Sequence, residues 1–295
     1  MARIAIVGVG AIGGVIASLL QTADRHELVL CVRRPLEQLV VQTPEQEIRI
    51  KATILTSPEE ASAVDWVMVA TKAYDVETAA RWFDALCAKG APVAVLQNGV
   101  EHRERFAPYQ AKEKLVPVIV DCPAERDSSL AGIDRIAQRG SMSLRVPESK
   151  LGQEFVELFA GTRADAAAVE DWTTVAWKKL CHNAVGALPA LLLQPAGVLR
   201  GEAMGSVALD MVRECIAIGR AEGAVFSDSF AEEVLAACRR AAPDSINSLH
   251  ADRLAGRPME IDARNGAIVR KGHAHGIPAP TNAMAVALLE ALAAK

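Results

Sequence analysis

Three glycines near the start of the chain are spaced for binding a phosphate. Gly8, Gly10 and Gly13 form the pattern G-x-G-x-x-G between the apolar runs RIAIV and VIASLL. In such a loop the first glycine allows a tight turn, the second lets the backbone approach a pyrophosphate, and the third lets a helix pack on a strand. The N–H groups that begin the helix then face the phosphate. We therefore predict a dinucleotide site made by Gly8, Gly10, Ala11, Ile12 and Gly13, in preference to a simple turn.

Two arginines follow the second apolar run, ELVLCV. Arg33 and Arg34 stand where an NAD site usually carries an acidic residue for the ribose 2′-hydroxyl. A guanidinium offers a planar fork to phosphate oxygens, so this position suits a 2′-phosphate. We predict NADP as the cofactor, with Arg33 as a contact; the alternative is a solvated basic turn.

Two further apolar runs end in polar residues. VMVATKAYD places Lys72 after one run, and VAVLQNGV places Asn98 after the other. Ligands bind at the carboxyl ends of the strands in open α/β sheets. Lys72 would neutralise a cofactor phosphate or a substrate carboxylate, and Asn98 would hydrogen-bond to ribose or substrate. The competing interpretation of Asn-Gly is a turn.

A lysine and an asparagine share one face of an apolar helix in the second half. The segment VAWKKLCHNAVGALPALLL holds Lys179 and Asn183 four residues apart. Burial disfavours an ammonium ion and lowers its pKa toward the range useful for proton transfer, so Lys179 is a candidate general acid. The alternative is that the lysines of this helix extend to water. His182 points elsewhere on the helix and is interpreted as a histidine at the edge of the core.

Hydroxyl and acidic side chains recur in the polar segment 245–282. Ser248, Glu260 and Asp262 are candidates for one binding site. The alternative is that the acids form ion pairs on a solvated face with nearby arginines. These arginines are Arg253, Arg257 and Arg264.

Hydrophobic patterning predicts the elements that position these residues. Short Val/Ile/Leu-rich runs, ending with KLVPVIV, alternate with helical patterns, which is typical of a doubly wound parallel α/β sheet. The segment 127–150 is less regular and predicts one or two irregular or antiparallel strands. After Asp171 the periodicity is helical almost throughout. We predict a Rossmann-like domain over residues 1–166 and an all-helical domain over residues 167–295.

Composition argues against several classes of protein. The 295 residues carry 32 basic and 36 acidic side chains, with no Lys/Arg block, so we expect no nucleic-acid partner. The six cysteines form no C-x-x-C pair and no Cys/His cluster at zinc-ligand spacing, so no metal site is predicted. The chain opens without a leader-like pattern, and no run approaches ~18 uninterrupted apolar residues. We expect a cytoplasmic protein with no membrane partner.

Five motifs occur in an order that resembles a known family. The glycine loop, TKAYD, QNGV, WKKLCHNA and GRPMEID with the later GIPAPTN are similar to the ketopantoate reductases over nearly the whole chain. The resemblance implies an NADPH-binding Rossmann domain followed by a helical domain, with the active site in the cleft between them. It also implies reduction of a 2-oxo acid, ketopantoate, to pantoate in pantothenate biosynthesis.

The resemblance assigns roles to individual residues. It implies that Lys179 is the general acid that protonates the ketone oxygen, and that Glu260 interacts with bound substrate. It further implies that Asn98, Asn183 and Ser248 contact the substrate. The implied cofactor contacts outside the glycine loop are Arg33, Lys72 and Asn98.

The sequence departs from the family pattern at one helical position. The family helix commonly carries a second asparagine one turn after Asn183, and this chain has Ala187 there. A lost hydrogen-bond partner costs ~1 to 3 kcal/mol in a polar site. Ala187 therefore motivates one alternative to ketopantoate reduction, which is chemistry on another 2-oxo or hydroxy acid. A separate alternative, from a different class of protein, is NADPH sensing without catalysis. The apolar last helix, AMAVALLEALAA, suits a core or an interface, and a homodimer is expected.

Overall fold

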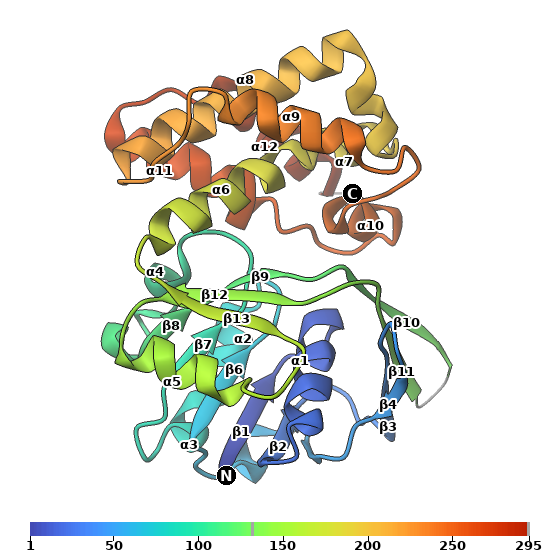
Figure 1. Ribbon diagram of the computed structural model, residues 1–295, viewed down its shortest axis with the longest axis vertical. Helices are drawn as coiled ribbons and strands as arrows, with labels where there is room; N and C mark the ends of the chain where they lie inside the picture. The colour runs from blue at the N-terminus through green and yellow to red at the C-terminus, as the bar shows by residue number, and fades with distance from the viewer. Residues whose placement is uncertain (131–132, 294–295) are drawn as a thin grey trace. The chain divides into compact units, whose positions relative to one another are not determined.

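The computed structural model describes residues 1–130 and 133–293, which fold into two compact units (Figure 1). Unit 1 consists of Met1–Gln97 and His102–Trp172, and unit 2 consists of Asn98–Glu101 and Thr173–Lys295.

The chain therefore enters unit 2 twice. The last crossing, between Trp172 and Thr173, lies a few residues beyond the predicted boundary at 166/167. The reason is that strand β13 (Asp165–Val169) pairs in parallel with a strand of unit 1. The earlier excursion, Asn98–Glu101, was not predicted from the sequence. It is fastened to unit 2 by an ion pair between Glu101 and Arg270, with Oε2 and Nη2 2.6 Å apart.

Unit 1 is built on a six-stranded sheet of order β5-β2-β1-β6-β7-β8, in which all neighbouring strands are parallel. Along β1, Ile4 and Ile6 pack into one hydrophobic core while Ala5 and Val7 pack into another. This alternation gives the sheet a core on each face, and the predicted doubly wound fold is confirmed. The strands are β1 (Ala2–Val7), β2 (His26–Cys31), β5 (Thr53–Leu55), β6 (Trp66–Val69), β7 (Val93–Val95) and β8 (Leu115–Pro117).

Helices cover both faces of this sheet. On one face lie α1 (Ala11–Thr22) and α5 (Lys150–Leu158), whose apolar side chains belong to the same core as Ile4. The other face is covered by three short helices that share a core with Val7. They are α2 (Val76–Ala80), α3 (Phe83–Leu86) and α4 (His102–Phe106).

Two smaller sheets complete unit 1. The apolar run KLVPVIV, expected to be one strand, divides into β8 and β9 (Ile119–Asp121), and β9 pairs with β12 (Ser143–Pro147) in a separate sheet with β13. The four-stranded sheet has the order β10-β11-β3-β4. Its β10 and β11 are antiparallel, as the irregular segment predicted. Its strands are β10 (Ala124–Leu130), β11 (Ile133–Gln138), β3 (Gln38–Gln42) and β4 (Glu47–Arg49).

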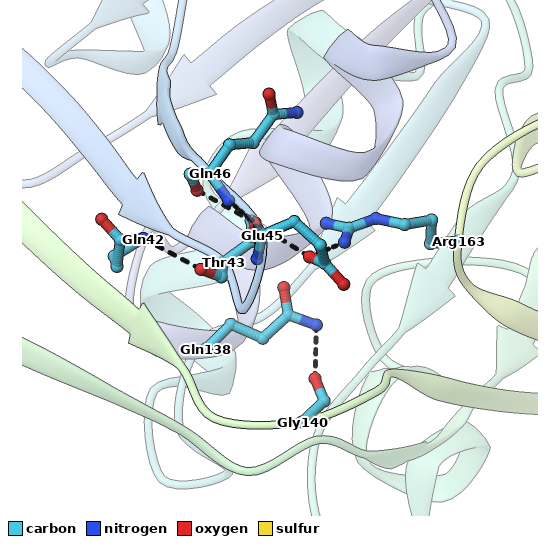
Figure 2. Close-up of polar contacts among 7 residues, drawn as sticks. All are labelled: Gln42, Thr43, Glu45, Gln46, Gln138, Gly140 and Arg163. Atoms are coloured by element: carbon cyan, nitrogen blue, oxygen red, sulfur yellow. Dashed lines mark hydrogen bonds and ion pairs between the residues drawn. The ribbon is translucent and has the colours of Figure 1, made fainter.

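A polar cluster holds the turn between β3 and β4 (Figure 2). The Thr43 hydroxyl donates to the Gln46 carbonyl at 2.9 Å and accepts from the Gln46 N–H at 3.1 Å. Glu45, at the tip of the turn, forms an ion pair with Arg163, which precedes β13. The Thr43 N–H also donates to the Gln46 carbonyl at 2.9 Å, so backbone and side-chain hydrogen bonds close the turn together, without a glycine.

The described elements of unit 2 are all helical, as predicted (Figure 1). The predicted helix over 175–193 is interrupted at Gly186, where a Cβ would lie 3.1 Å from the Asn183 carbonyl oxygen and 3.3 Å from Asn247 Nδ2. The described part of the chain has no helix long and apolar enough for a membrane span. The helices are α6 (Trp172–Val185), α7 (Ala187–Leu192), a 3₁₀ turn (Ala196–Arg200), α8 (Glu202–Ala221), α9 (Phe230–Arg240), α10 (Ser248–Leu254), a π-helical segment (Asp262–Gly266), α11 (Ala267–His275) and α12 (Pro280–Ala293).

Candidate active site

The glycine loop joins β1 to α1 at the carboxyl edge of the main sheet. Gly8 has a φ of +92°, and a Cβ there would lie 2.6 Å from the Thr71 side chain; a Cβ at Gly13 would overlap the Gly8 carbonyl oxygen. These two positions need glycine for steric reasons. Gly10 differs, because nothing lies within 4 Å of the place a Cβ would take. Gly10 caps α1 without a side-chain hydrogen bond, and the first turn of α1 carries no acid. The position beside Gly10, at the start of α1, is therefore open, as a site for a pyrophosphate requires.

Arg33 follows β2, as the sequence predicted. Its side chain is 75% exposed, and its Nη1 lies 3.6 Å from Oδ2 of Asp75. Exposed ion pairs of this kind contribute little to stability. The guanidinium can therefore turn toward a phosphate at low cost.

Lys72 lies in the loop after β6 and is held through its backbone. The Gln97 side-chain amide donates to the Thr71 hydroxyl at 3.0 Å and to the Lys72 carbonyl at 3.1 Å. The Gln97 carbonyl in turn accepts from Nε2 of His102 at 2.8 Å. These hydrogen bonds connect the ends of β6 and β7 and support the loop that Gly8 contacts.

His102 is a supporting residue that the sequence did not reveal. Its ring is 3% exposed and packs edge-on against Trp172. Burial lowers the pKa of His102 to about 4, so the ring is neutral near pH 7 and donates only from Nε2. Its buried Nδ1 has no hydrogen-bond partner among the described residues, which also disfavours a second proton. The sequence contained one indication of this supporting role, which is that His102 follows Gln97 by five residues.

In unit 2, Asn98 and Glu260 are brought together. Asn98 Nδ2 donates to Glu260 Oε2 at 3.0 Å, across a separation of 162 residues. Glu260 is 4% exposed, so the interpretation of this acid as part of a solvated face is wrong. Gly99 makes the approach possible: its φ is +106°, and a Cβ would lie 2.5 Å from the Ala263 carbonyl oxygen.

Ser248 is the first residue of α10. The preceding Asn247 caps this helix, because its Oδ1 accepts from the His250 N–H at 3.0 Å. Asn247 also donates to the Gly186 carbonyl at 3.0 Å and so ties Ser248 to the junction of α6 and α7. The Ser248 hydroxyl accepts from Nη2 of Arg264 at 2.7 Å. Asn247 was not singled out from the sequence, although an asparagine before a helical pattern is an N-cap signal.

The three candidate arginines behave differently from the solvated-face interpretation. Arg264 is 4% exposed. Arg257 Nε pairs with Oδ1 of Asp252 at 2.9 Å, and Arg253 donates to the Leu191 carbonyl at 2.6 Å. Asp262 is exposed and forms its ion pair with a fourth arginine, Arg270.

Lys179 and Asn183 lie on α6, four residues apart, and both are half-buried. The neighbouring Lys178 is turned differently, with its Nζ 5.5 Å from the centre of the Phe230 ring. Ala187 begins α7 and is fully buried in the hydrophobic core of unit 2. Position 187 is therefore filled by core packing in this chain.

The candidate residues divide between the units. Unit 1 holds the glycine loop, Arg33 and Lys72, and unit 2 holds the others. Across the described residues, no group of three or more His, Cys, Asp and Glu side chains is placed to hold a metal ion. The candidates in unit 2 are Asn98, Lys179, Asn183, Ser248 and Glu260.

Comparison with protein families covers both units. The family model of ketopantoate reductase PanE/ApbA matches residues 4–146, and the model of its C-terminal region matches residues 171–293. The chain belongs to the ketopantoate reductase family. Within this family, it is similar to the 2-dehydropantoate 2-reductase of Caulobacter vibrioides, with 49% identity over 293 residues, 99% of this chain and 100% of the relative.

Solved structures agree with this membership. A ketopantoate reductase from Ralstonia eutropha JMP134 has a TM-score of 0.87 and 29% identity, and the match covers 99% of this chain and 98% of that one. A ternary structure of D-mandelate dehydrogenase with NADH and anilino(oxo)acetate has a TM-score of 0.86 over the same shares of the two chains. Its identity of 23% makes that likeness one of fold.

Proposed function

We propose that this chain reduces ketopantoate to pantoate with NADPH. The observation that carries the proposal is the 49% identity, over 99% of the chain, to the Caulobacter vibrioides 2-dehydropantoate 2-reductase. 2-Dehydropantoate is ketopantoate under its systematic name. Two contacts in unit 2 support this proposal, because Asn98 with Glu260 and Ser248 with Arg264 offer donors and acceptors suited to a hydroxylated acid.

The cofactor site in this proposal lies in unit 1. Bound NADPH supplies the hydride for the carbonyl carbon. The backbone of the glycine loop would hold the pyrophosphate, in the space that Gly10 leaves open. The exposed guanidinium of Arg33 would pair with the 2′-phosphate, and Lys72 would add positive charge near the phosphates. The loop residues assigned to the cofactor are Gly8, Gly10, Ala11, Ile12 and Gly13, and Asn98 is assigned to both cofactor and substrate.

Lys179 supplies the proton in the proposed reaction. As the carbonyl carbon is reduced, negative charge develops on the ketone oxygen. The Nζ ammonium of Lys179 stabilises this charge and then transfers a proton to the oxygen. Asn183, one turn along α6, and Ser248 would hold the carboxylate or hydroxyl of the acid.

Glu260 orients Asn98 in this scheme. Its carboxylate accepts one amide hydrogen of Asn98, which fixes the direction of Oδ1 and of the second amide hydrogen. The oriented amide is then a ready partner for a substrate hydroxyl. Because Glu260 is buried, it keeps this orientation without competition from bulk water.

The first test is NADPH oxidation by the purified protein with ketopantoate. A panel of other 2-oxo acids and an NADH control are run beside it. We expect turnover that prefers ketopantoate and NADPH. Preference for NADH would contradict the role of Arg33, and binding of NADPH without turnover of any acid would favour a sensor.

A second candidate function is reduction of a different 2-oxo acid. The observation in its favour is Ala187, which is buried where the family helix commonly carries an asparagine. Turnover of another acid in the panel, without turnover of ketopantoate, would establish this second function in place of the first.

A further inference from the structure

Arg264 is a buried cation in unit 2 that the proposed reaction does not use. Its side chain is 4% exposed, and its Nε has no hydrogen-bond partner in the described part of the chain. A guanidinium keeps its charge across the physiological pH range. Burying that charge is costly unless nearby groups compensate it. The groups around Arg264 therefore indicate what the charge is for.

The contact with Ser248 fixes the direction of a hydroxyl hydrogen. Nη2 of Arg264 donates to Ser248 Oγ at 2.7 Å, so the oxygen acts as acceptor in this bond. The hydroxyl hydrogen of Ser248 then points away from Arg264. Ser248 is exposed at the first position of α10, so this hydrogen is available to an incoming acceptor. A hydroxyl that accepts from a cation is also a stronger donor to an anion.

Arg264 also balances a buried acid. Glu260 and Asp252 are each 4% exposed, and Asp252 is paired with Arg257 at 2.9 Å. Arg264 feels the charges of both acids, which raise its pKa, although burial has the larger effect and lowers it. Arg264 therefore contributes positive charge beside both acids. Its removal would make the potential around Glu260 more negative and less favourable to an anionic substrate.

The backbone places Arg264 and Glu260 together. They are four residues apart: Glu260 lies two residues before the π-helical segment Asp262–Gly266, and Arg264 lies within it. π-Helical turns within helices occur frequently at functional sites. The same segment brings the Ala263 carbonyl close to Gly99, the residue after Asn98. One short element thus carries Arg264 and packs against the backbone next to Asn98.

We propose that Arg264 is a positioning residue for the carboxylate of the substrate. It holds the Ser248 hydroxyl as a donor to the carboxylate and offsets the charge of Glu260. The inference rests on the proposed function, because it requires that unit 2 takes a 2-oxo acid. The proposal makes Arg264 responsible for selecting the acid over its uncharged amide, although Arg264 was not among the substrate-site residues predicted from the sequence.

The test compares Arg264→Met, Arg264→Lys and Ser248→Ala, with the double variant of Arg264→Met and Ser248→Ala. Arg213→Met is the matched control, because Arg213 is a half-exposed arginine of unit 2 that pairs with Glu232 at 3.0 Å. For each protein, kcat and KM are measured with ketopantoate and with the corresponding 2-oxo amide. The Kd for NADPH and the Tm are measured in parallel.

We expect Arg264→Met to raise KM for the acid about tenfold or more and to leave the Kd for NADPH within about twofold. The preference for acid over amide should fall by a similar factor. Arg264→Lys should recover part of the preference, since it restores the charge without the fork. The acid-to-amide preference of the double variant should lie within about twofold of that of the poorer single variant. The reason is that both substitutions remove the same interaction, between Arg264 and Ser248.

Three results would overturn the inference. The first is an unchanged acid-to-amide preference in Arg264→Met, and the second is the same loss of preference in Arg213→Met. The third is strict additivity in the double variant. If the wild type reduces another 2-oxo acid, the ketopantoate proposal fails and the variants are tested with that acid. If it neither reduces nor binds any acid of the panel, both proposals fail.

Discussion

At the scale of single residues, Asn98 matters because it is an amide and not an acid. Its Nδ2 donates to Glu260 Oε2 at 3.0 Å. Asn98→Asp would place two carboxylates at this distance, which raises the pKa of one of them. We expect kcat/KM of Asn98→Asp to fall about 10- to 100-fold at pH 8 and to recover partly as the pH falls, when a shared proton restores the donor.

The measurement for this prediction is the pH profile of kcat/KM from pH 5 to pH 9. Asn98→Ala is the reference, since it removes the amide without adding charge. Parallel profiles for the two variants would show that the carboxylate pair does not govern activity.

Lys179 and Lys178 form a natural pair of variants on α6. Both are half-buried, but Lys178 lies over the Phe230 ring. We expect Lys179→Met to lower kcat by about 10²- to 10⁴-fold, the usual contribution of a general acid, with little change in the Kd for NADPH. Lys178→Met should retain most of the turnover. Single-turnover kinetics on both variants would check this, and equal losses would remove Lys179 from its role.

The residue types of the site were accessible from the sequence, but their surroundings were not. Asn98 was singled out because it follows an apolar run, and Glu260 because it is an acid in a polar segment of a helical region. Their hydrogen bond was not predicted, since spacing carries no information about a contact across 162 residues. For Arg264 the sequence offered only the alternative of an ion pair on a solvated face, because charged residues are rarely buried without partners. Its burial depends on Ser248 and on the acids around it, which only the folded chain brings together.

At the scale of elements, the glycines of the β1–α1 turn have different roles. Gly8 and Gly13 are required by close packing, whereas Gly10 is assigned to the cofactor. Gly10 has open space where a methyl group would lie and a φ of −87°, so alanine fits there. Gly10→Ala should change the Tm by no more than about 2 °C, yet weaken NADPH binding about tenfold or more. Gly13→Ala should instead lower the Tm by several degrees, because its methyl group would overlap the Gly8 carbonyl.

Thermal unfolding and NADPH fluorescence titration measure these two effects separately. If Gly10→Ala binds NADPH normally, the loop is only a turn and the cofactor assignment fails.

His102, the first residue of α4, makes the free energy of unfolding depend on pH. His102 has a folded-state pKa of about 4, below its unfolded value of about 6.5. Between these values the unfolded chain binds the proton more readily, so stability is lost as the pH falls. The expected loss from this ring is about 2 kcal/mol in the free energy of unfolding between pH 7 and pH 5.

Urea unfolding of the wild type and of His102→Gln checks this effect, because glutamine keeps a donor for the Gln97 carbonyl but does not titrate. The variant should lose less stability on acidification. His273→Gln, at an exposed histidine of α11, is the control. A slope in His102→Gln equal to that of the wild type would contradict the prediction.

Patterning predicted most elements because each buried strand or helix face has its own hydrophobic period. It failed where the chain changes direction inside an apolar run. After Lys114, the run LVPVIV is uniformly apolar, but β8 and β9 belong to different sheets. The long predicted helix over 175–193 also breaks at Gly186, whose surroundings include Asn247 from a distant segment.

At the scale of the whole molecule, self-association stays a prediction from the apolar last helix. In α12, Met284, Leu288 and Leu292 follow one another at four-residue spacing and are 54%, 48% and 40% exposed. We expect the protein to be a dimer by light scattering, and Leu288→Glu to be a monomer. A monomeric wild type would show that these side chains are simply exposed.

The two-unit organisation was predictable, but its connectivity was not. A change from alternating strands to continuous helices marks the second unit in the sequence. The excursion Asn98–Glu101 carries no such mark, because it is four residues long and is held by Glu260 and Arg270, far along the chain.

That excursion limits how relatives of this chain can recombine. A single crossover near residue 172 would join a helical unit from one parent to residues 98–101 from the other. Asn98 would then meet a foreign Glu260 neighbourhood, and Gly99 a foreign π-helical segment. Functional hybrids should therefore take residues 98–101 and residues 173–295 from the same parent, although these two segments are separated in the sequence.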